Sequence, residues 1–422
     1  MTITMDSKKV IHEITSTARK AASVLATLST GEKDKALLSM AESIDASRDK
    51  IKKANEADIA AAEEKGKAAS FVDRLTLGDK RIDGMCEMLR QVAKHPDPVG
   101  TVLESIRRPN GLVIDKVRVP IGVIGIIYES RPNVTADCAA LCLKSGNSVI
   151  LRGGTGAIET NKAIYEAMKE GASKENLPEG AFILIEDTSR ELVGAMLEAS
   201  EDIDLIMPRG GESLIRQVVE KSRIPVIKHY KGICHVYVDA DADLDMAEEI
   251  CFNAKVQRPG VCNAMETMLV HEKVAEKFLP RMTEKFKKAD VKMKGCEATR
   301  KIVSDIEDVT DEDFTTEWLD LVLNIRVVPS LDEAIGHIAK FGSAHSDAIV
   351  TKNDKTGEEF VRRVDSAAVY INVSTRFTDG GEFGKGAEIG ISTDRLHARG
   401  PMGLEELCTY KYVVRGNGQI RT

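Results

Sequence analysis

The pattern of apolar and polar positions divides the chain into a helical beginning and a longer α/β remainder. From residue 7 to about residue 98, apolar residues recur at helical spacing, most clearly in the segment 35–44. We expect these residues to form a helical entry to a larger domain. From Pro120 onward, short apolar β-type runs alternate with helical patterns. Such alternation predicts a parallel sheet that is covered by helices on both faces.

The β-type runs fall into two series. The first series comprises residues 121–128, 148–151, 182–185, 205–207 and 225–228. The second series comprises residues 235–238, 268–270, 325–328, 348–350 and 369–371. Helical patterns separate the runs within each series. We therefore predict two doubly wound α/β domains that are joined near Tyr230 to Gly232.

Residues 107–119 interrupt this alternation. Asn110-Gly111 lies there between two alternating segments, and this dipeptide is the strongest short-range sign of a β-hairpin. The closing run 407–415 is also β-patterned, although chain ends are usually polar and poorly ordered. An isolated two-stranded ribbon is only marginally stable, so both segments need a sheet to join.

Composition narrows the class of protein. The chain has 422 residues, which suggests two or three domains, and 42% of its residues are hydrophobic. Its net charge of -8, with both signs interspersed, argues against a nucleic-acid surface. No apolar run reaches the roughly 18 residues that a membrane helix requires, and the beginning of the chain lacks a signal-peptide core. We therefore expect a cytoplasmic protein without nucleic-acid or membrane partners.

One of the eight cysteines differs from the rest. Seven fall within helical or strand-like patterns, where burial keeps a thiol protonated and inert. Cys262 instead follows the turn Pro259-Gly260 and precedes an apolar run, so we interpret it as a candidate nucleophile. The local sequence alone also fits a loop cysteine without a role. Since no cysteines or histidines have metal-ligand spacing, we expect no metal site and a reducing compartment.

Two glycine-rich turns are candidates for phosphate binding. The dinucleotide motif Gly-x-Gly-x-x-Gly is missing after the first strand of the predicted sheet. Arg152-Gly153-Gly154 nevertheless follows a predicted strand and opens a helix, so its backbone amides are suited to hold a phosphate. A plain tight turn is an equally good interpretation. Arg209-Gly210-Gly211 repeats the arrangement after the run 205–207.

Taken together, these segments resemble the aldehyde dehydrogenase superfamily. The resemblance rests on residues 120–128, Arg131-Pro132-Asn133, the two Arg-Gly-Gly runs and residues 257–262, in this order. The runs 370–384 and 387–403 resemble the γ-glutamyl phosphate reductase family within that superfamily. The family implies NADPH-dependent reduction of γ-glutamyl 5-phosphate to glutamate 5-semialdehyde and phosphate, the second step of proline biosynthesis from glutamate.

The resemblance implies two catalytic residues. Cys262 would attack the acyl phosphate and form a thioester, and Asn133 would donate a hydrogen bond to the oxyanion. Capping of the following helix is the other interpretation of Asn133. Oxidising members have a Glu that activates water in the segment Glu-Leu-Gly-Gly, where this chain has His229-Tyr230-Lys231-Gly232. The lack of a carboxylate there suits a thioester that must survive until it is reduced. His229 itself is either part of the site or a structural residue at the domain junction.

The resemblance also implies NADP(H) as the cofactor. Arg152 takes the place of a lysine that contacts the adenosine ribose, and Thr155 takes the place of the ribose-binding Glu of NAD-preferring members. A cation without that carboxylate favours a 2′-phosphate. Glu317 matches the position that holds the nicotinamide ribose, but Leu319 replaces the Phe of that motif, and helix capping is the other interpretation. The cofactor candidates are Arg152, Gly153, Gly154, Arg209, Gly210, Gly211 and Glu317.

Arginines beside the catalytic candidates are expected to bind the substrate. Arg131 and Arg258 are candidates for the phosphate, because a guanidinium binds an oxyanion bidentately. Arg376, with Ser374 and Thr375, is the candidate for the α-carboxylate. Each of these arginines also fits an ion pair between domains.

The resemblance finally implies a domain division and an assembly. Residues 1–104 and 120–230 would bind NADP, and residues 231–402 would form the catalytic domain. Residues 105–119 and 403–422 would form an oligomerisation hairpin and strand, which predicts a homodimer or a dimer of dimers. Two other functions stay open: a CoA-acylating aldehyde dehydrogenase, and a catalytically silent nucleotide-binding partner of glutamate kinase. A transient complex of the enzyme with that kinase is also open.

Overall fold

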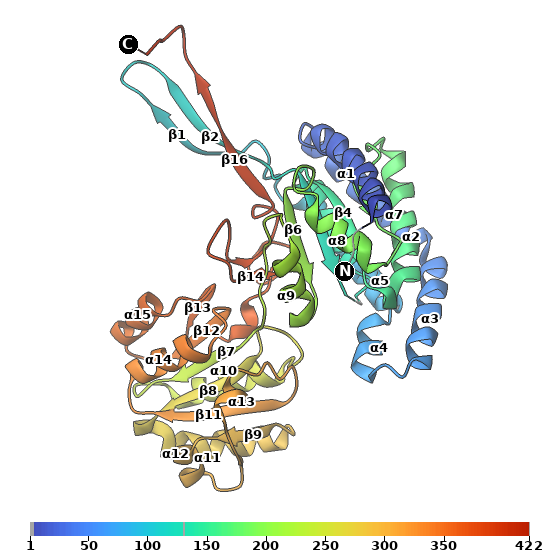
Figure 1. Ribbon diagram of the computed structural model, residues 1–422. Helices are drawn as coiled ribbons and strands as arrows, with labels where there is room; N and C mark the ends of the chain where they lie inside the picture. Colours follow the sequence, from blue (N-terminus) through green and yellow to red (C-terminus); the bar gives the residue numbers. More distant parts are fainter. Residues whose placement is uncertain (1–3, 130, 422) are drawn as a thin grey trace. The chain divides into compact units, whose positions relative to one another are not determined.

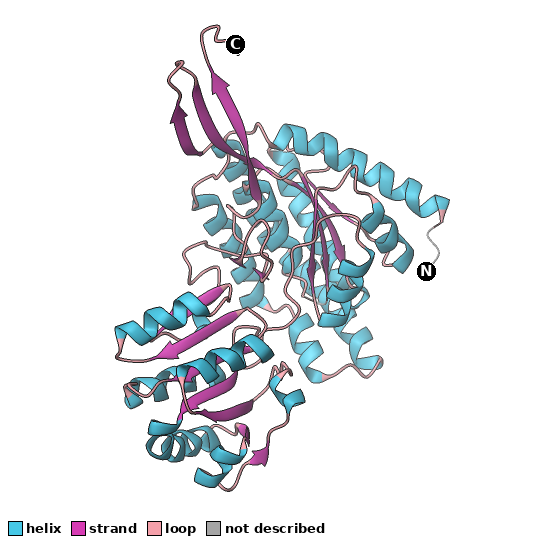
Figure 2. Ribbon diagram, turned by 60° about the vertical axis from the view of Figure 1, so that its left-hand side comes forward, coloured by secondary structure: helices cyan, strands magenta, loops and turns pink. Residues whose placement is uncertain are grey.

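The computed structural model describes residues 4–129 and 131–421, apart from the side chain of residue 70. The chain divides into two compact units. The first unit comprises Met1–Lys228, Gly384–Gly390 and Met402–Thr422, and the second comprises His229–Phe383 and Ile391–Pro401. Residues 384–390 therefore belong with the first unit, whereas the sequence placed them in the catalytic domain. Each unit contains a parallel sheet with helices (Figure 2), so the predicted α/β class is confirmed.

The first unit begins with helices, as the periodicity predicts. They are α1 (Met5–Leu25), α2 (Thr30–Ala46), α3 (Arg48–Glu64), α4 (Ala69–Leu75) and α5 (Asp79–Lys94). A capping box begins α2, because the Ser29 hydroxyl accepts the Glu32 N–H while the Glu32 carboxylate accepts the Ser29 N–H. Helix α2 packs on α7 (Ile158–Lys174), and a Cβ at Gly171 would lie only 2.6 Å from the Ser39 carbonyl oxygen. Glycine therefore permits this close approach.

The parallel sheet of the first unit has the order β5-β4-β3-β6. Its strands are β3 (Val123–Tyr128), β4 (Ser148–Gly153), β5 (Phe182–Leu184) and β6 (Leu205–Arg209), and its further helices are α6 (Val134–Lys144), η1 (Thr155–Ala157), α8 (Arg190–Glu198) and α9 (Glu212–Lys221). Strand β3 lies between β4 and β6, so the carboxyl ends of these three parallel strands are adjacent. The predicted strand 225–228 is wrong. Only an isolated bridge joins Val226 to Ile206, because neither Pro225 nor Pro208 on β6 has an N–H to continue the ladder on either side.

The second unit contains a seven-stranded parallel sheet of order β10-β9-β11-β8-β7-β12-β13. Its strands are β7 (Cys234–Val238), β8 (Met265–His271), β9 (Lys292–Gly295), β10 (Glu307–Asp308), β11 (Val322–Val328), β12 (Ser346–Val350) and β13 (Ala368–Ile371). Strand β7 lies between β8 and β12, so the amino ends of these three strands are adjacent.

Helices and a small sheet complete the second unit. The helices are α10 (Leu244–Val256), α11 (Glu272–Lys288), α12 (Glu297–Ile302), α13 (Asp311–Phe314), α14 (Leu331–Phe341), α15 (Asp354–Arg363) and η2 (Thr375–Phe377), and β14 (Ile391–Ser392) pairs with β15 (Gly400–Pro401). Side chains of β7 alternate between two cores: Val236 and Val238 pack with α10 and α11, and Tyr237 packs with α14 and α15. Both faces of this sheet are therefore covered, as a doubly wound fold requires.

A three-stranded antiparallel sheet belongs to the first unit. Strands β1 (Val102–Arg107) and β2 (Val113–Pro120) form the hairpin that the sequence predicts, and β16 (Cys408–Arg415) pairs with β2 along its whole length. Gly111 in the hairpin turn has a φ of 89°, which suits glycine. Figure 1 shows this sheet as a long ribbon that extends away from the four-stranded sheet of the same unit. In the described part of the chain, no helix has the length and apolarity to cross a membrane.

Candidate active site

Cys262 lies on the loop between α10 and β8. Of the eight cysteines, only Cys262 and Cys296 are half-buried, and the other six are buried. Burial raises the pKa of each of those six thiols, which keeps them protonated. Cys296 directly precedes α12, and its sulfur lies 3.2 Å from the Thr299 hydroxyl without capping the helix. The structure therefore singles out Cys262 as an accessible thiol on a loop.

The loop that carries Cys262 is held at both ends. The Lys255 Nζ, near the end of α10, lies 2.8 Å from the Glu266 Oε2 on β8, and both side chains are fully buried. Burial lowers the pKa of Lys255 and raises the pKa of Glu266, and the attraction between the two charges opposes both shifts. Within the loop, the Asn263 amide donates to the Thr378 carbonyl (2.9 Å), and the Thr375 hydroxyl donates to the Asn263 carbonyl (2.7 Å). These contacts fix the backbone around the thiol.

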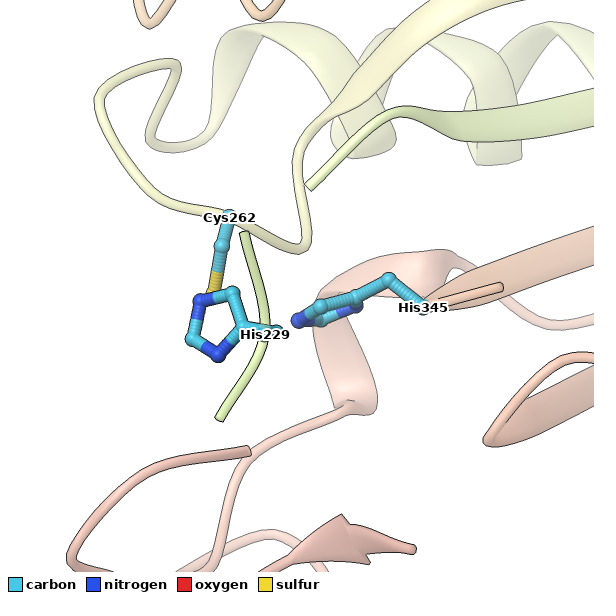
Figure 3. A group of neighbouring side chains, drawn as sticks. All are labelled: His229, Cys262 and His345. Carbon is cyan, nitrogen blue, oxygen red and sulfur yellow. The ribbon is translucent and has the colours of Figure 1, made fainter. Parts of the chain in front are cut away.

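Three side chains meet at the amino edge of the seven-stranded sheet: His229, Cys262 and His345 (Figure 3). They precede β7, β8 and β12, which are neighbours in the sheet. Their nitrogen and sulfur ligand atoms all lie within 4.8 Å of one another. Gly232 permits this approach, because a Cβ at that position would overlap the Cys262 carbonyl.

Both histidines are anchored through Nδ1. The His229 Nδ1 lies 2.7 Å from the Ile391 carbonyl oxygen, and a carbonyl only accepts, so Nδ1 carries the proton and Nε2 has the lone pair. The His345 Nδ1 lies 2.8 Å from the Ser346 hydroxyl and 3.7 Å from the Cys234 sulfur. Complete burial, with a smaller contribution from His229, holds the pKa of His345 well below its usual range. His345 is therefore neutral at physiological pH.

The substrate candidates of the second unit lie around the same loop. The Arg376 guanidinium donates to the Gln257 side chain through Nε (2.9 Å) and to the Asn263 side chain through Nη1. The Ser374 hydroxyl accepts the Arg376 N–H, and Ser374 is buried. Burial, followed by the charge of the exposed Arg258, lowers the pKa of Arg376. Two guanidinium groups that oppose each other's charge favour an anion between them.

Glu317 does not cap a helix. Its Oε1 accepts the Gly232 N–H at 2.9 Å, and the residue lies between α13 and β11. The capping interpretation from the sequence is therefore wrong. Leu319, two residues later, has a φ of 52° and donates its N–H to Glu266 at 3.3 Å. The buried Glu266 thus fixes both the cysteine loop and the segment that carries Glu317.

In the first unit, the turn Arg152-Gly153-Gly154 lies at the carboxyl end of β4. One Nη of Arg152 donates to the Thr188 carbonyl, and the buried Arg152 Nε has no partner among the described residues. Burial lowers the pKa of Arg152. A Cβ at Gly153 would overlap the side-chain amide of Asn161, so any other residue would displace that buried side chain. The turn leads into η1 and α7, as the sequence predicts, and it provides backbone amides and a cation at one place.

The second glycine turn already holds a carboxylate. The Gly211 N–H at the beginning of α9 donates to the Glu129 Oε2 at 3.0 Å, and a Cβ at Gly210 would lie 2.7 Å from the Glu129 carboxyl carbon. The Arg209 side chain packs on Gly390, which has a φ of 153°. A phosphate at this helix beginning would compete with the Glu129 carboxylate, so the turn is the weaker of the two candidates.

Asn133 precedes α6 but does not cap it with its side chain. Its Nδ2 donates instead to the Asp137 Oδ2 at 2.7 Å, one helical turn later. The capping interpretation is therefore not supported, and the amide has a fixed orientation. Burial raises the pKa of Asp137 to about 6, against the opposing effects of Asn133 and Arg209. Arg131, the other phosphate candidate, is exposed in the segment between β3 and α6.

The structure thus gathers the predicted residues in two places. Those of the second unit surround the cysteine loop: Cys262, Arg258, Glu317, Ser374, Thr375 and Arg376. Those of the first unit lie at adjacent strand ends: Arg131, Asn133, Arg152, Gly153, Gly154, Arg209, Gly210 and Gly211. The sequence did not indicate His345 or the pair of Lys255 and Glu266. One signal was present, because His345 directly precedes an apolar strand, and His229 and Cys262 lie in the short segments before two other apolar strands.

Comparisons with known proteins agree with this arrangement. Residues 1–302 match the family model described as the aldehyde dehydrogenase family. A γ-glutamyl phosphate reductase of Thermodesulfovibrio yellowstonii is 55% identical over 417 residues, which is 99% of this chain and 100% of that protein. The reductase of the same name from Caldanaerobacter subterraneus is 56% identical over 96% of this chain and 98% of its own length.

Solved structures give the same result. The crystal structure of γ-glutamyl phosphate reductase from Thermotoga maritima matches with a TM-score of 0.96 and 50% identity, over 98% of this chain and 100% of that chain. An acetylating aldehyde dehydrogenase from Geobacillus thermoglucosidasius covers 99% of both chains with a TM-score of 0.69, but its identity of 17% supports the fold alone. The predicted aldehyde dehydrogenase fold is confirmed. The chain belongs to the aldehyde dehydrogenase family and, within it, to the γ-glutamyl phosphate reductases.

Proposed function

We propose that this chain reduces γ-glutamyl 5-phosphate to glutamate 5-semialdehyde and phosphate with NADPH, in the second step of proline biosynthesis from glutamate. The observation that carries the proposal is the half-buried Cys262, held on a fixed loop at the amino edge of the sheet in a chain of the reductase family. An acyl phosphate is an electrophile that a thiolate attacks readily, and a thioester is reduced more easily than a carboxylate.

The proposed chemistry at Cys262 has two stages. The thiolate sulfur bonds to the acyl carbon, the bond from that carbon to the phosphate oxygen breaks, and phosphate leaves. The nicotinamide cofactor, when bound, supplies the hydride that reduces the resulting thioester. The carbon–sulfur bond then breaks, which releases the aldehyde and restores the thiolate. No carboxylate occupies the segment His229-Tyr230-Lys231-Gly232, so the water-activating Glu of oxidising relatives is missing at that position.

Arginines are proposed to bind the substrate. Arg258 is exposed beside the loop and, with Arg131, is suited to the phosphate, and Arg376 with Ser374 and Thr375 is suited to the α-carboxylate. The proximity of Arg258 to Arg376 supports an anionic ligand, since it opposes the charge of Arg376. Arg376 now bonds to Gln257 and Asn263 of the loop. A bound carboxylate would replace Gln257 and Asn263 as the hydrogen-bond partner of Arg376. Binding of the substrate would therefore influence the position of the cysteine loop.

A nicotinamide cofactor follows from the family, and we propose NADP(H) rather than NAD(H). The Arg152 Nε, which has no partner among the described residues, lies in a turn where glycine leaves room for the Asn161 side chain, and it suits a phosphorylated adenosine ribose. Gly154, the turn Arg209-Gly210-Gly211 and Glu317 are proposed as further contacts. Because Glu317 now holds the Gly232 N–H, contact with a ribose hydroxyl would require its second oxygen or a small rotation. We also propose a cytoplasmic location, with a transient contact to glutamate kinase.

One assay separates this function from its alternatives. The reverse reaction is followed as NADP⁺ reduction with glutamate 5-semialdehyde, with and without phosphate, and with CoA in place of phosphate. We expect turnover with phosphate and no turnover when CoA replaces phosphate. Turnover that requires CoA would instead support a CoA-acylating enzyme, and cofactor binding without any turnover would support a silent partner of the kinase.

A further inference from the structure

The cluster at the amino edge of the sheet offers more than a nucleophile. We propose that His229, Cys262 and His345 form a binding site for a soft divalent cation, best suited to Zn²⁺, and that the bound ion blocks the nucleophile reversibly. The effect on turnover rests on the proposed role of Cys262. Binding itself rests only on the positions of the three side chains.

The distances suit a three-ligand zinc site. The ligand atoms lie within 4.8 Å of one another. Zinc bonds of about 2.3 Å to sulfur and about 2.0 Å to nitrogen, in tetrahedral geometry, place neighbouring ligands roughly 3.3 to 3.6 Å apart. Each ligand therefore has to move by at most about 1 Å, which small side-chain rotations provide. Thiolate and imidazole together favour zinc over magnesium or calcium, which prefer oxygen ligands.

Both histidines have the outer hydrogen bonds that metal-binding histidines require. A histidine that binds metal through Nε2 usually donates its Nδ1 proton to a protein oxygen. The His229 Nδ1 donates to the Ile391 carbonyl at 2.7 Å, and the His345 Nδ1 lies 2.8 Å from the Ser346 hydroxyl. In Figure 3 the remaining nitrogen of each ring points toward the other members of the cluster.

His345 carries the strongest evidence for a ligand. It is fully buried, and its Nε2 has no hydrogen-bond partner within the described part of the chain. A buried polar atom in this state is rare unless it serves a ligand. Behind the ring, the Ser346 hydroxyl lies 2.6 Å from that of Thr378, which lies 2.7 Å from the Tyr370 hydroxyl. This chain of hydroxyls fixes the ring with Nε2 directed into the cluster.

The chemistry of binding is a simple exchange. The Cys262 thiol releases its proton to solvent, and the sulfur forms a bond to the cation, so no oxidant or reductant is needed. Three protein ligands leave a fourth position for water. A metal-bound sulfur no longer attacks the acyl phosphate, and a chelator restores the free thiol.

Cobalt(II) provides a direct test, because a bond between sulfur and cobalt gives a near-ultraviolet charge-transfer band. The full chain, with its thiols reduced, is titrated with Co²⁺ and then with Zn²⁺. We expect a charge-transfer band that Zn²⁺ removes, and loss of turnover that a chelator reverses. Cys262→Ser should abolish the band, and His345→Ala should weaken binding by at least about a hundredfold. Because His345 is buried, the half-buried His229→Ala is a second variant, with the same expected result.

Cys296→Ser is the matched control, because Cys296 is the other half-buried thiol, and it should leave the band unchanged. A wild-type protein without the band, although Cys262 is still alkylated by iodoacetamide, would overturn the proposal. A band that survives Cys262→Ser, or an affinity that neither histidine variant changes, would also overturn it. Full turnover of Cys262→Ser would contradict the proposed function instead and would leave the metal test intact.

Discussion

Asn133 is the proposed catalytic residue of the first unit. Its amide has two N–H groups, and one of them donates to Asp137 at 2.7 Å. We propose that the second donates to the oxyanion, which exists only in the transition states and intermediates. Asn133→Ala should therefore lower kcat by about a hundredfold or more, with a smaller change in KM. Steady-state kinetics tests this, and a change confined to KM would place Asn133 in ground-state binding.

The partner of Asn133 gives a prediction on pH. Burial raises the pKa of Asp137 from 3.8 to about 6. Because the folded value is the higher one, the stability that this carboxyl contributes is complete below pH ~4 and is lost as the pH rises through 6. Asp137→Asn keeps an acceptor for Asn133 but has no charge. Urea unfolding should show the variant gaining stability relative to the wild type between pH ~4 and ~8, and a constant difference would contradict the assigned pKa.

Arg152 is expected to set the cofactor preference. Arg152→Ala should weaken binding of NADPH more than that of NADH, by ~1 to 3 kcal/mol, because a charge-assisted bond to the 2′-phosphate is lost. Fluorescence titration with both cofactors measures the difference. Arg223→Ala, which removes an exposed arginine after α9, is the matched control. Equal weakening of both cofactors would show that Arg152 does not contact the 2′-phosphate of the adenosine ribose.

At the scale of elements, one buried ion pair closes the loop that presents the thiol. Lys255 on α10 and Glu266 on β8 are both fully buried, and their charges lie 2.8 Å apart. Lys255→Ala leaves an unpaired buried carboxylate, so the free energy of unfolding should fall by about 3 to 5 kcal/mol. The double change Lys255→Met, Glu266→Leu should be far less destabilising. Denaturant unfolding of both variants decides this, and equal losses would show that the pair carries no mutual stabilisation.

The elements also show what a sequence does and does not reveal. Helix α6 begins and ends where the pattern predicts. The apolar run lies between a turn and Gly146, and these two breaks fix both ends of the helix. Cys262 was identified because a thiol after Pro259-Gly260 departs from the pattern of buried cysteines. His345 was not, because it lies 83 residues further along, and only the order β8-β7-β12 brings it near. A search for metal-ligand spacing in the sequence misses ligands that precede separate strands, because such ligands are far apart along the chain.

The usual location of ligand sites in parallel sheets applies to the first unit but not to the second. Such sites lie beyond the carboxyl ends of the strands, and the turn at Arg152 does so in the first unit. In the second unit, Cys262, His229 and His345 lie at the amino ends instead. The location of this cluster therefore follows from the three-dimensional arrangement, whereas the sequence alone singles out Cys262 as the candidate nucleophile.

At the scale of the whole molecule, the three-stranded sheet points to assembly. Strands β1 and β16 lie at its two edges, and exposed apolar side chains line it: Val102, Leu103, Ile106, Tyr410, Tyr412 and Val414. A long edge strand with exposed apolar groups tends to pair with another chain. We propose a homodimer or a dimer of dimers that forms through this sheet.

Truncation after Gly403 tests the assembly, because it removes β16. Sedimentation should show monomers or insoluble protein, since β2 loses the strand that it pairs with along its whole length. A soluble truncated protein with an unchanged oligomeric mass would exclude the tail from assembly. Tyr412→Lys, a change of one exposed side chain, is a milder variant that should weaken association without removing the strand.

Cys262 is proposed to form the covalent bond to the substrate, and a comparison of three proteins tests this role. Phosphate-dependent NADP⁺ reduction with glutamate 5-semialdehyde is measured for the wild type, Cys262→Ser and the control Cys296→Ser, with cofactor binding measured in parallel. Cys262→Ser should lose turnover by several orders of magnitude and bind the cofactor nearly as well, while the control should keep its rate. Retention of more than about a tenth of the wild-type rate by Cys262→Ser would show that Cys262 is not the nucleophile.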